Sequence, residues 1–354
     1  MKYTNLFSPI KVGNVTLKNR IVMPPMDSNS NNMDGSLSRK CFAYLSERAR
    51  GGVGLIIMEA VSVDWPEGKI SERQLSMNSR NITADLHDLV EVVHSYGGKI
   101  IPQLHHGGFL AHPEFCNGAE SISASDTSSP FPPARAMTIE EIENMIQKFI
   151  NAAKNAQMSG MDGVEIHASH MYLINQFLSP LSNYRTDEYG GSLENRTRML
   201  VKIIKGIREE CGKDFLLSVR LGVKDAIPGG IELEEGKEIA KICEEAGADL
   251  INCTTGLYMT LEMMTEGQYQ EEGARLYFAK AIKPALTNAK VAIVGKFRTP
   301  SICDKAIADG DTDLVCIGRQ LICDPFWPTK AEEGREDEIR SCLNCDEGCL
   351  HQFY

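Results

Sequence analysis

The sequence has no run of apolar residues long enough to cross a membrane, and its first twenty residues lack the apolar centre of a signal peptide. Positive charge is also scarce, because 37 Lys and Arg residues stand against 48 Asp and Glu residues, which gives a net charge of −11 at pH 7. A chain with that balance does not attract the phosphate backbone of a nucleic acid. These absences predict a cytoplasmic protein with neither nucleic acid nor membrane as a partner.

No G-x-G-x-x-G motif follows an apolar run, which disfavours a Rossmann nucleotide domain within this chain. Instead, short β-branched runs alternate with longer segments of helical period. The runs occupy residues 20–26, 54–60, 99–106, 163–170, 215–222, 248–255, 291–297 and 313–319. Eight strand and helix pairs predict an α/β protein, a closed (β/α)8 TIM barrel over residues 1–335, followed by a short cysteine-rich tail over 336–354.

Polar side chains gather where the predicted strands end, which is the face on which such barrels build their sites. These residues are Asp27, Glu59, Gln103, His105, His106, His167, His170, Arg220, Thr254, Lys296 and Arg319. Three connections, 107–137, 171–191 and 256–274, are longer than the others, and long loops on that face commonly shape a substrate pocket. The concentration of polar groups therefore predicts a functional site there.

The segment GVEIHASHMY places His167, His170 and Tyr172 just beyond the fourth predicted strand. If the chain turns there, two imidazoles can donate hydrogen bonds to one carbonyl oxygen that gains negative charge, and a phenol can donate a proton to a neighbouring carbon. Two other interpretations stay open. The histidines could hold a metal, although Glu165 is expected to point away from them, or they could be core histidines bonded to the backbone.

Several motifs resemble one family in the same order. They are NLFSPIKVGNVTLKNRIVMPPM, PQLHHGG, the histidine segment, SVRLG, VGKF and DLVCIGRQLICDPFWPTKA. This set resembles the Old Yellow Enzyme family of FMN-dependent ene-reductases, which fold as (β/α)8 barrels, and the resemblance spans residues 5–331. It implies that FMN is reduced by NAD(P)H and passes hydride from N5 to the C=C bond of an α,β-unsaturated carbonyl compound.

The same resemblance implies the residues of the site by matching position. His167 and His170 anchor the carbonyl and Tyr172 is the proton donor. The residues around the flavin ring are Pro25, Met26, Asp27, Ala60, Gln103 and Arg220, and those around the FMN phosphate are Gly295, Lys296, Gly318 and Arg319. A fixed guanidinium at Arg220 would stabilise the anionic reduced flavin.

Asp27 departs from the family pattern, in which Cys, Thr or His is common. An ionised carboxylate there would disfavour the anionic reduced flavin, so we expect that the pKa of Asp27 is raised or that its side chain points aside. The substrate class stays open between an enone, an enoate and an enoyl-CoA. An amine dehydrogenase or demethylase, and a non-catalytic electron-transfer subunit, are the competing functions, and a homo-oligomer is neither required nor excluded.

The tail contains Cys342, Cys345 and Cys349 with the spacing C-x2-C-x3-C, which suggests a metal or iron–sulfur site that normally takes four ligands. It resembles the iron–sulfur branch of the family, which includes 2,4-dienoyl-CoA reductase, 2-enoate reductases and bile-acid dienoate reductases. In that branch a fourth cysteine completes a 4Fe-4S cluster, and here it would fall at position 361, past the last residue. The resemblance therefore implies a tail truncated from a longer chain whose missing part could bind FAD. Zinc with His351, or no metal, stays open.

Overall fold

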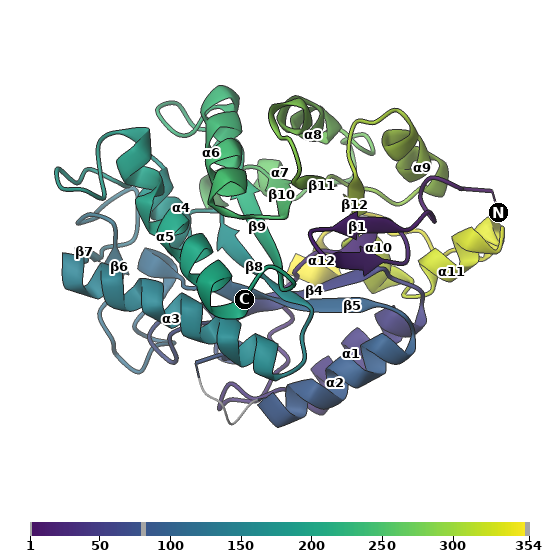
Figure 1. The fold of residues 1–354 in the computed structure, drawn as a ribbon, viewed down its shortest axis with the longest axis horizontal. Coiled ribbons are helices and arrows are strands. Elements are labelled where there is room, and N and C mark those ends of the chain that lie inside the picture. Colours follow the sequence, from purple (N-terminus) through teal and green to yellow (C-terminus); the bar gives the residue numbers. More distant parts are fainter. Residues whose placement is uncertain (1, 79–82, 351–354) are drawn as a thin grey trace.

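The computed structural model describes residues 2–78 and 83–350, and its centre is a closed barrel of eight parallel strands. The strands are β3 (Ile21–Met23), β4 (Leu55–Ser62), β5 (Lys99–His105), β8 (Gly163–Ala168), β9 (Leu216–Gly222), β10 (Leu250–Thr254), β11 (Lys290–Val294) and β12 (Leu314–Cys316). The first strand pairs with the last, β3 with β12, which closes the circle. The prediction of a (β/α)8 barrel and of its eight strands is confirmed (Figure 1).

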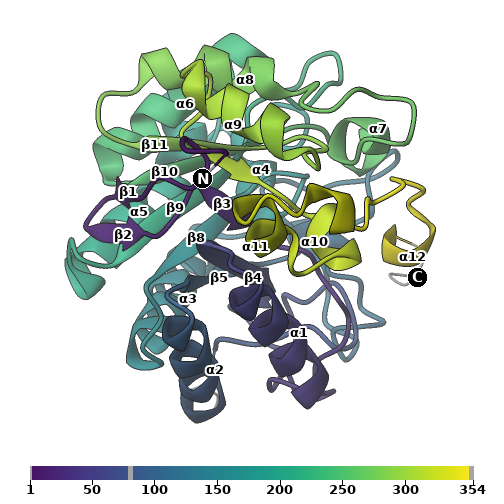
Figure 2. The ribbon, with the colours of Figure 1, turned by 90° about the vertical axis from the view of Figure 1, so that its right-hand side faces the viewer.

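An outer layer of helices covers the barrel, as Figures 1 and 2 show. Its members are α1 (Arg39–Arg50), α2 (Thr83–Ser95), α3 (Ile139–Met158), α5 (Leu193–Cys211), α6 (Leu233–Ala246), α8 (Leu276–Ile282) with η4 (Lys283–Ala285), α9 (Pro300–Ala308), α10 (Arg319–Cys323) and α11 (Trp327–Glu332). Helix α3 shows why these segments form helices that pack on the barrel. Thr138 and Glu141 form a capping box at its start, and its apolar stripe, which includes Ile142, Met145 and Phe149, is buried.

A β-hairpin closes the end of the barrel at which the strands begin. It pairs β1 (Ile10–Val12) with β2 (Val15–Leu17) around a turn at Gly13, whose φ is +56°. Ile10, Val12 and Leu17 form one buried apolar cluster with residues near the starts of the barrel strands, among them Leu55 and Leu216. This end is therefore filled by aliphatic side chains.

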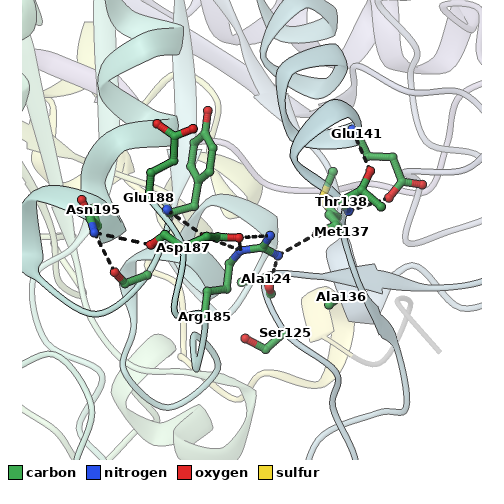
Figure 3. Close-up of polar contacts among 12 residues, drawn as sticks. Ala124, Ser125, Ala136, Met137, Thr138, Glu141, Arg185, Asp187, Glu188 and Asn195 are labelled. Carbon is green, nitrogen blue, oxygen red and sulfur yellow. Dashed lines mark hydrogen bonds and ion pairs between the residues drawn. The ribbon is translucent and has the colours of Figure 1, made fainter.

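Short elements fill the three long connections at the other end. They are η2 (Gly108–Leu110), β6 (Ile122–Ser123), β7 (Arg135–Ala136), α4 (Leu173–Leu178), η3 (Tyr258–Thr260) and α7 (Leu261–Met264). Arg185 ties two of these connections together, because its Nη1 donates to the backbone oxygens of Ala124 and Met137, both at 2.7 Å, while Nε and Nη2 bind Asp187 (Figure 3). The loops on this face therefore hold one another in place.

The tail passes through η5 (Glu336–Glu338) and returns to the same face with α12 (Glu347–Leu350). Gln320 fastens it to the barrel, since its side chain donates to the backbone oxygen of Arg340 at 2.8 Å and accepts from the backbone N–H of Cys342 at 2.9 Å. Figure 2 shows α12 on the side of the molecule opposite the hairpin. In residues 2–78 and 83–350, no helix combines the length and apolarity that a membrane crossing requires.

Candidate active site

The strand ends and the loops above them enclose a cavity of about 450 Å³. Twelve of the thirteen residues predicted for catalysis or for FMN line it, and these are Pro25, Met26, Asp27, Ala60, Gln103, His167, His170, Tyr172, Arg220, Lys296, Gly318 and Arg319. Gly295 stands between two lining residues, Val294 and Lys296. His106 lies elsewhere, with its Nδ1 accepting from the backbone N–H of Gly108. The predicted residues are thus brought to a single cavity.

Arg220 at the end of β9 presents a buried cation to this cavity. Its Nη2 donates to Thr254 Oγ1 at 3.4 Å, whereas Nη1 is buried and has no hydrogen-bond partner among the described residues. A buried N–H of a guanidinium without an acceptor costs free energy, and a ligand oxygen or nitrogen would satisfy it. This donor therefore fits a ligand with an electron-rich edge, as the pyrimidine side of a flavin has.

Glu165 corrects one expectation. It was expected to point away from the histidine pair, but residues two apart on a strand face the same side, and Glu165 lies in the barrel interior below His167. Its carboxylate accepts hydrogen bonds at 2.8 Å each from Gln103 Nε2, Ser218 Oγ and Asn252 Nδ2. Burial raises the pKa of Glu165, while Arg220 and these donors act against that rise. The glutamate thereby fixes Gln103 at the cavity wall.

The segment after β8 turns sharply, because His170 and Met171 adopt left-handed backbone conformations with φ of 60° and 62°. The ring centroids of His167 and His170 lie 5.3 Å apart, and those of His167 and Tyr172 lie 4.7 Å apart. His170 Nε2 is hydrogen-bonded to Thr254 Oγ1 at 3.0 Å and His167 Nδ1 to Ser169 Oγ at 3.3 Å, so these hydrogen bonds go to side-chain hydroxyls rather than to the backbone. The predicted turn brings the three rings together.

Both histidines are neutral at physiological pH. Burial lowers the pKa of His167 and of His170 well below the ordinary value, and the nearby Arg220 cation lowers both further. A neutral imidazole donates one N–H, so each ring can donate one hydrogen bond without a charge of its own.

Two rings that the sequence did not assign to the reaction surround Tyr172. The hydroxyl of Tyr258, from η3, is hydrogen-bonded to the hydroxyl of Tyr172, and Tyr258 is 39% exposed while Tyr172 is 5% exposed. The ring of His105 meets the Tyr172 ring edge-on with centroids 4.3 Å apart. Burial lowers the pKa of His105 to about 3, so this ring is also neutral. Tyr258 lies in a long connection without periodicity, and no signal in the sequence singles it out.

The loops after β11 and β12 hold the residues predicted for the phosphate. A Cβ on Gly318 would lie 3.2 Å from Met26 Sδ, and one on Gly295 would lie 3.3 Å from the Cβ of Arg275, so a side chain at either position would force its neighbour to shift. Lys296 lines the cavity, but its Nζ donates to the backbone oxygens of Gly267 and Gln268 at 3.0 and 2.9 Å. Its ammonium therefore holds the 256–274 connection.

A charge cluster that the sequence did not reveal surrounds Arg319. The buried carboxylate of Glu266 pairs with Arg275 Nε at 2.8 Å and with Arg319 Nη2 at 3.6 Å. From the tail, Asp346 Oδ1 accepts from Arg319 Nη1 at 2.5 Å. Two carboxylates thus balance the cations at this end of the cavity.

The tail contributes two of its three cysteines to the cavity wall, Cys342 and Cys349, whereas Cys345 is exposed. Within the described residues, no group of three or more His, Cys, Asp or Glu side chains is arranged to hold a metal ion. His351, the alternative zinc ligand, lies outside the described residues. The iron–sulfur site stays a prediction.

Comparison with known proteins identifies the family. The model of the NADH:flavin oxidoreductase / NADH oxidase family matches residues 5–338. The chain belongs to this family. Among its relatives is an NADH oxidase of Thermoanaerobacter brockii, 45% identical over 98% of this chain and 54% of that protein. A cinnamate reductase of Clostridium sporogenes is 34% identical over 99% of this chain and 56% of its own length.

A solved structure of this family fold, a 2-naphthoyl-CoA reductase in complex with 2-naphthoyl-CoA, superimposes with a TM-score of 0.95 at 35% identity and covers 99% of this chain and 55% of that one. The chain therefore spans about half the length of each of these three relatives. The expected resemblance to FMN-dependent ene-reductases is confirmed at the level of the family.

Proposed function

We propose that this member of the NADH:flavin oxidoreductase / NADH oxidase family binds FMN and reduces the C=C bond of an α,β-unsaturated carbonyl compound, with NAD(P)H as the electron source. The observation that carries the proposal is the arrangement of His167, His170 and Tyr172 on one wall of a cavity that Arg220 also lines. Two neutral N–H donors, one phenol and one fixed cation are the groups that such a reduction requires.

The residues present fit FMN. Arg220 has a buried N–H that lacks an acceptor among the described residues and suits the N1 and O2 side of a flavin. The loops after the last two barrel strands contain Gly295 and Gly318, and barrels of this type often bind phosphate there. The bound flavin would supply the hydride, which is the chemistry that the protein itself lacks.

The protein's own residues orient the substrate and move the proton. His167 and His170 each donate one N–H to the carbonyl oxygen, which gains negative charge as the reaction proceeds. The Tyr172 hydroxyl gives its proton to the α-carbon. Tyr258 is more exposed and is hydrogen-bonded to Tyr172. Its hydroxyl stabilises the resulting phenolate by donating a hydrogen bond to it. Because Tyr172 is almost fully buried, this transfer takes place with little competition from water.

The relatives named as cinnamate reductase and 2-naphthoyl-CoA reductase favour an aromatic enoate or an unsaturated acyl-CoA thioester as the substrate class. In both classes the double bond is conjugated with a carbonyl group, which is what two hydrogen-bond donors can polarise. An amine substrate offers no such oxygen. We therefore favour C=C reduction over amine oxidation and over a purely electron-transferring role.

We further propose that Cys342, Cys345 and Cys349 begin the site of a 4Fe-4S cluster whose fourth ligand lies outside this chain. Three closely spaced thiols are suitable ligands, and two of them already line the cavity. A cluster there would carry single electrons between FMN and an FAD held by a further domain. Iron and acid-labile sulfide in anaerobically purified protein would support this, and stoichiometric zinc without sulfide would reject it.

An anaerobic visible spectrum tests the flavin, and stopped-flow mixing tests the reaction. Reduced protein should be reoxidised by cinnamate or by an aromatic enoyl-CoA. We predict that Tyr172→Phe slows this reoxidation by about 100- to 1,000-fold, because a single positioned donor in an active site typically contributes that much. FMN content should stay unchanged.

The matched control is Tyr277→Phe, which removes a hydroxyl from an exposed tyrosine on α8 and should leave the rate unaltered. Full-rate turnover by the Tyr172 variant would remove this residue from its role. Folded protein that stays colourless with added FMN would overturn the proposed function as a whole.

A further inference from the structure

Two carboxylates lie on adjacent segments where β3 and β4 leave the barrel, a half-buried one at Asp27 and a buried one at Glu59. Asp27 lines the cavity, and Glu59 lies behind it, 6% exposed, against α1. No Lys, Arg or His of the described residues forms an ion pair with either carboxylate. Like charges on adjacent segments repel each other, and the burial of Glu59 adds to the cost, so ionisation of both carboxylates at once is disfavoured.

The hydrogen bonds around the pair are unequal. Glu59 Oε2 accepts from the backbone N–H of Ser28 at 2.7 Å and from Ser28 Oγ at 2.8 Å, and Oε1 accepts from Asn31 Nδ2. Asp27 Oδ1 accepts from the backbone N–H of Ala60 at 2.9 Å. Hydrogen-bond donors stabilise a carboxylate over its acid, so Glu59 is the better place for the negative charge and Asp27 for the proton.

The electrostatic surroundings agree with this division. Burial raises the pKa of both carboxylates, and the charge of Glu59 raises that of Asp27 further, to about 8, whereas the hydrogen bonds from Ser28 and Asn31 act against the rise at Glu59. The titratable groups that α1 packs against the pair stay neutral, since burial raises the pKa of Tyr44 to about 12 and that of the Cys41 thiol also. The cationic side chains that line the cavity are Lys40, Arg220, Lys296, Arg298 and Arg319, and the imidazole of His167 there is neutral.

We propose that Asp27 and Glu59 form a carboxylate dyad that holds one proton at neutral pH, and that Asp27 carries this proton as a hydrogen-bond donor to the ligand in the cavity. The ligand side of this inference rests on the proposed function, in which that ligand is FMN. A neutral donor at this wall tolerates an electron-rich flavin edge, whereas an ionised carboxylate would repel it. The dyad thus explains how an acidic residue can occupy this position.

The dyad also couples proton uptake to reduction. Below about pH 8 Asp27 is already protonated, so reduction of the bound flavin leaves it unchanged. Above that pH Asp27 is ionised beforehand, and the negative charge that arrives with two electrons draws one additional proton from solvent onto its carboxylate. Reduction therefore consumes one more proton per two electrons above this pH than below it.

The first test needs no flavin. Infrared difference spectra of the purified chain, titrated from pH 6 to pH 10, should show the C=O stretch of a protonated carboxylic acid disappear with a midpoint near pH 8. Asp27→Asn should lack this band. Glu59→Gln should move its midpoint to lower pH, because the neighbouring charge is gone. Glu165→Gln, which alters another buried carboxylate beside the cavity, should keep the change in absorbance with its midpoint near pH 8.

The second test uses the FMN-loaded protein and measures the reduction potential of the flavin against pH. For the wild type, the slope of the reduction potential against pH should become steeper near pH 8, by the amount that one additional proton per two electrons adds. For Asp27→Asn, the slope should stay the same through this pH. Absence of the band at pH 7, an unchanged band in Asp27→Asn, or identical plots would overturn the proposal. Protein that refuses FMN yet shows the titrating band would overturn the proposed function, and the dyad would stand.

Discussion

The two ends of the barrel are built from the same strands but differ in what they bury. On β9, Leu216 at the start belongs to the aliphatic cluster closed by the hairpin, whereas Arg220 four residues later carries a buried charge at the cavity. The closed end buries a cluster of aliphatic side chains, whereas the open end keeps Glu165 and an N–H of Arg220 in buried surroundings that cost free energy and raises the pKa of Asp27. Stability and chemistry are thus separated along each strand.

The largest expected effect on stability lies at the closed end. Leu17→Ala removes a fully buried side chain from the aliphatic cluster, and we expect a loss of about 4 kcal/mol in the free energy of unfolding, since such truncations leave a cavity. Chemical denaturation measures it. Leu17→Met, which conserves volume, should lose less than about 1.5 kcal/mol. A comparable loss of FMN affinity per folded molecule would contradict the separation of the two ends.

A smaller effect is expected at the loops of the open end. Arg185→Ala leaves the backbone oxygens of Ala124 and Met137 and the carboxylate of Asp187 without their shared donor, and we expect a loss of about 3 kcal/mol. The loss should be local, with faster amide hydrogen exchange in residues 107–137 and unchanged exchange in the hairpin. Arg185→Lys keeps the charge but not the planar fork of donors, so it should restore stability only in part. Uniformly faster exchange would argue against a local clamp.

The smallest of the three effects depends on pH. The pKa of His105 is lowered to about 3 in the folded protein, so the unfolded chain binds a proton below its ordinary pKa of 6.5 and the folded chain does not. The stability that the neutral ring contributes is complete above pH 6.5 and is lost as pH falls, by about 2 kcal/mol at pH 5.

Asp27, whose pKa is raised, acts in the opposite direction over the same range. The measurement is therefore the difference in unfolding free energy between wild type and His105→Asn at pH 5, 6 and 7. This difference should change with pH. Two parallel stability curves would show that His105 titrates as an ordinary histidine, and a closed-end control such as Leu17→Met should give parallel curves.

The barrel could be predicted from the sequence because its signal is local. Each strand is a short apolar run, each helix has its own period, and the count of eight admits few other architectures. The hairpin that closes one end was not predicted, since β1 and β2 have three residues each and derive their order from contact with the barrel strands.

Site residues that stand at the ends of predicted strands, such as His167 and Arg220, could be predicted from the sequence. Partners that come from distant loops could not be predicted. Tyr258, Glu266 and Arg275 lie in or just beyond a connection without periodicity, and only folding brings them to Tyr172 and Arg319. Glu165 was misplaced because the alternation of side chains along the strand was applied with the wrong phase.

The pairing of β3 with β12 leaves the central sheet with no free border. Every barrel strand has a neighbour on both sides, so the sheet offers no row of unpaired amides to which another polypeptide could add a strand. A partner domain or second copy therefore cannot extend the barrel sheet and has to dock on the hairpin, the helical layer or the loops, and such contacts can change during evolution while the circle of strands stays intact.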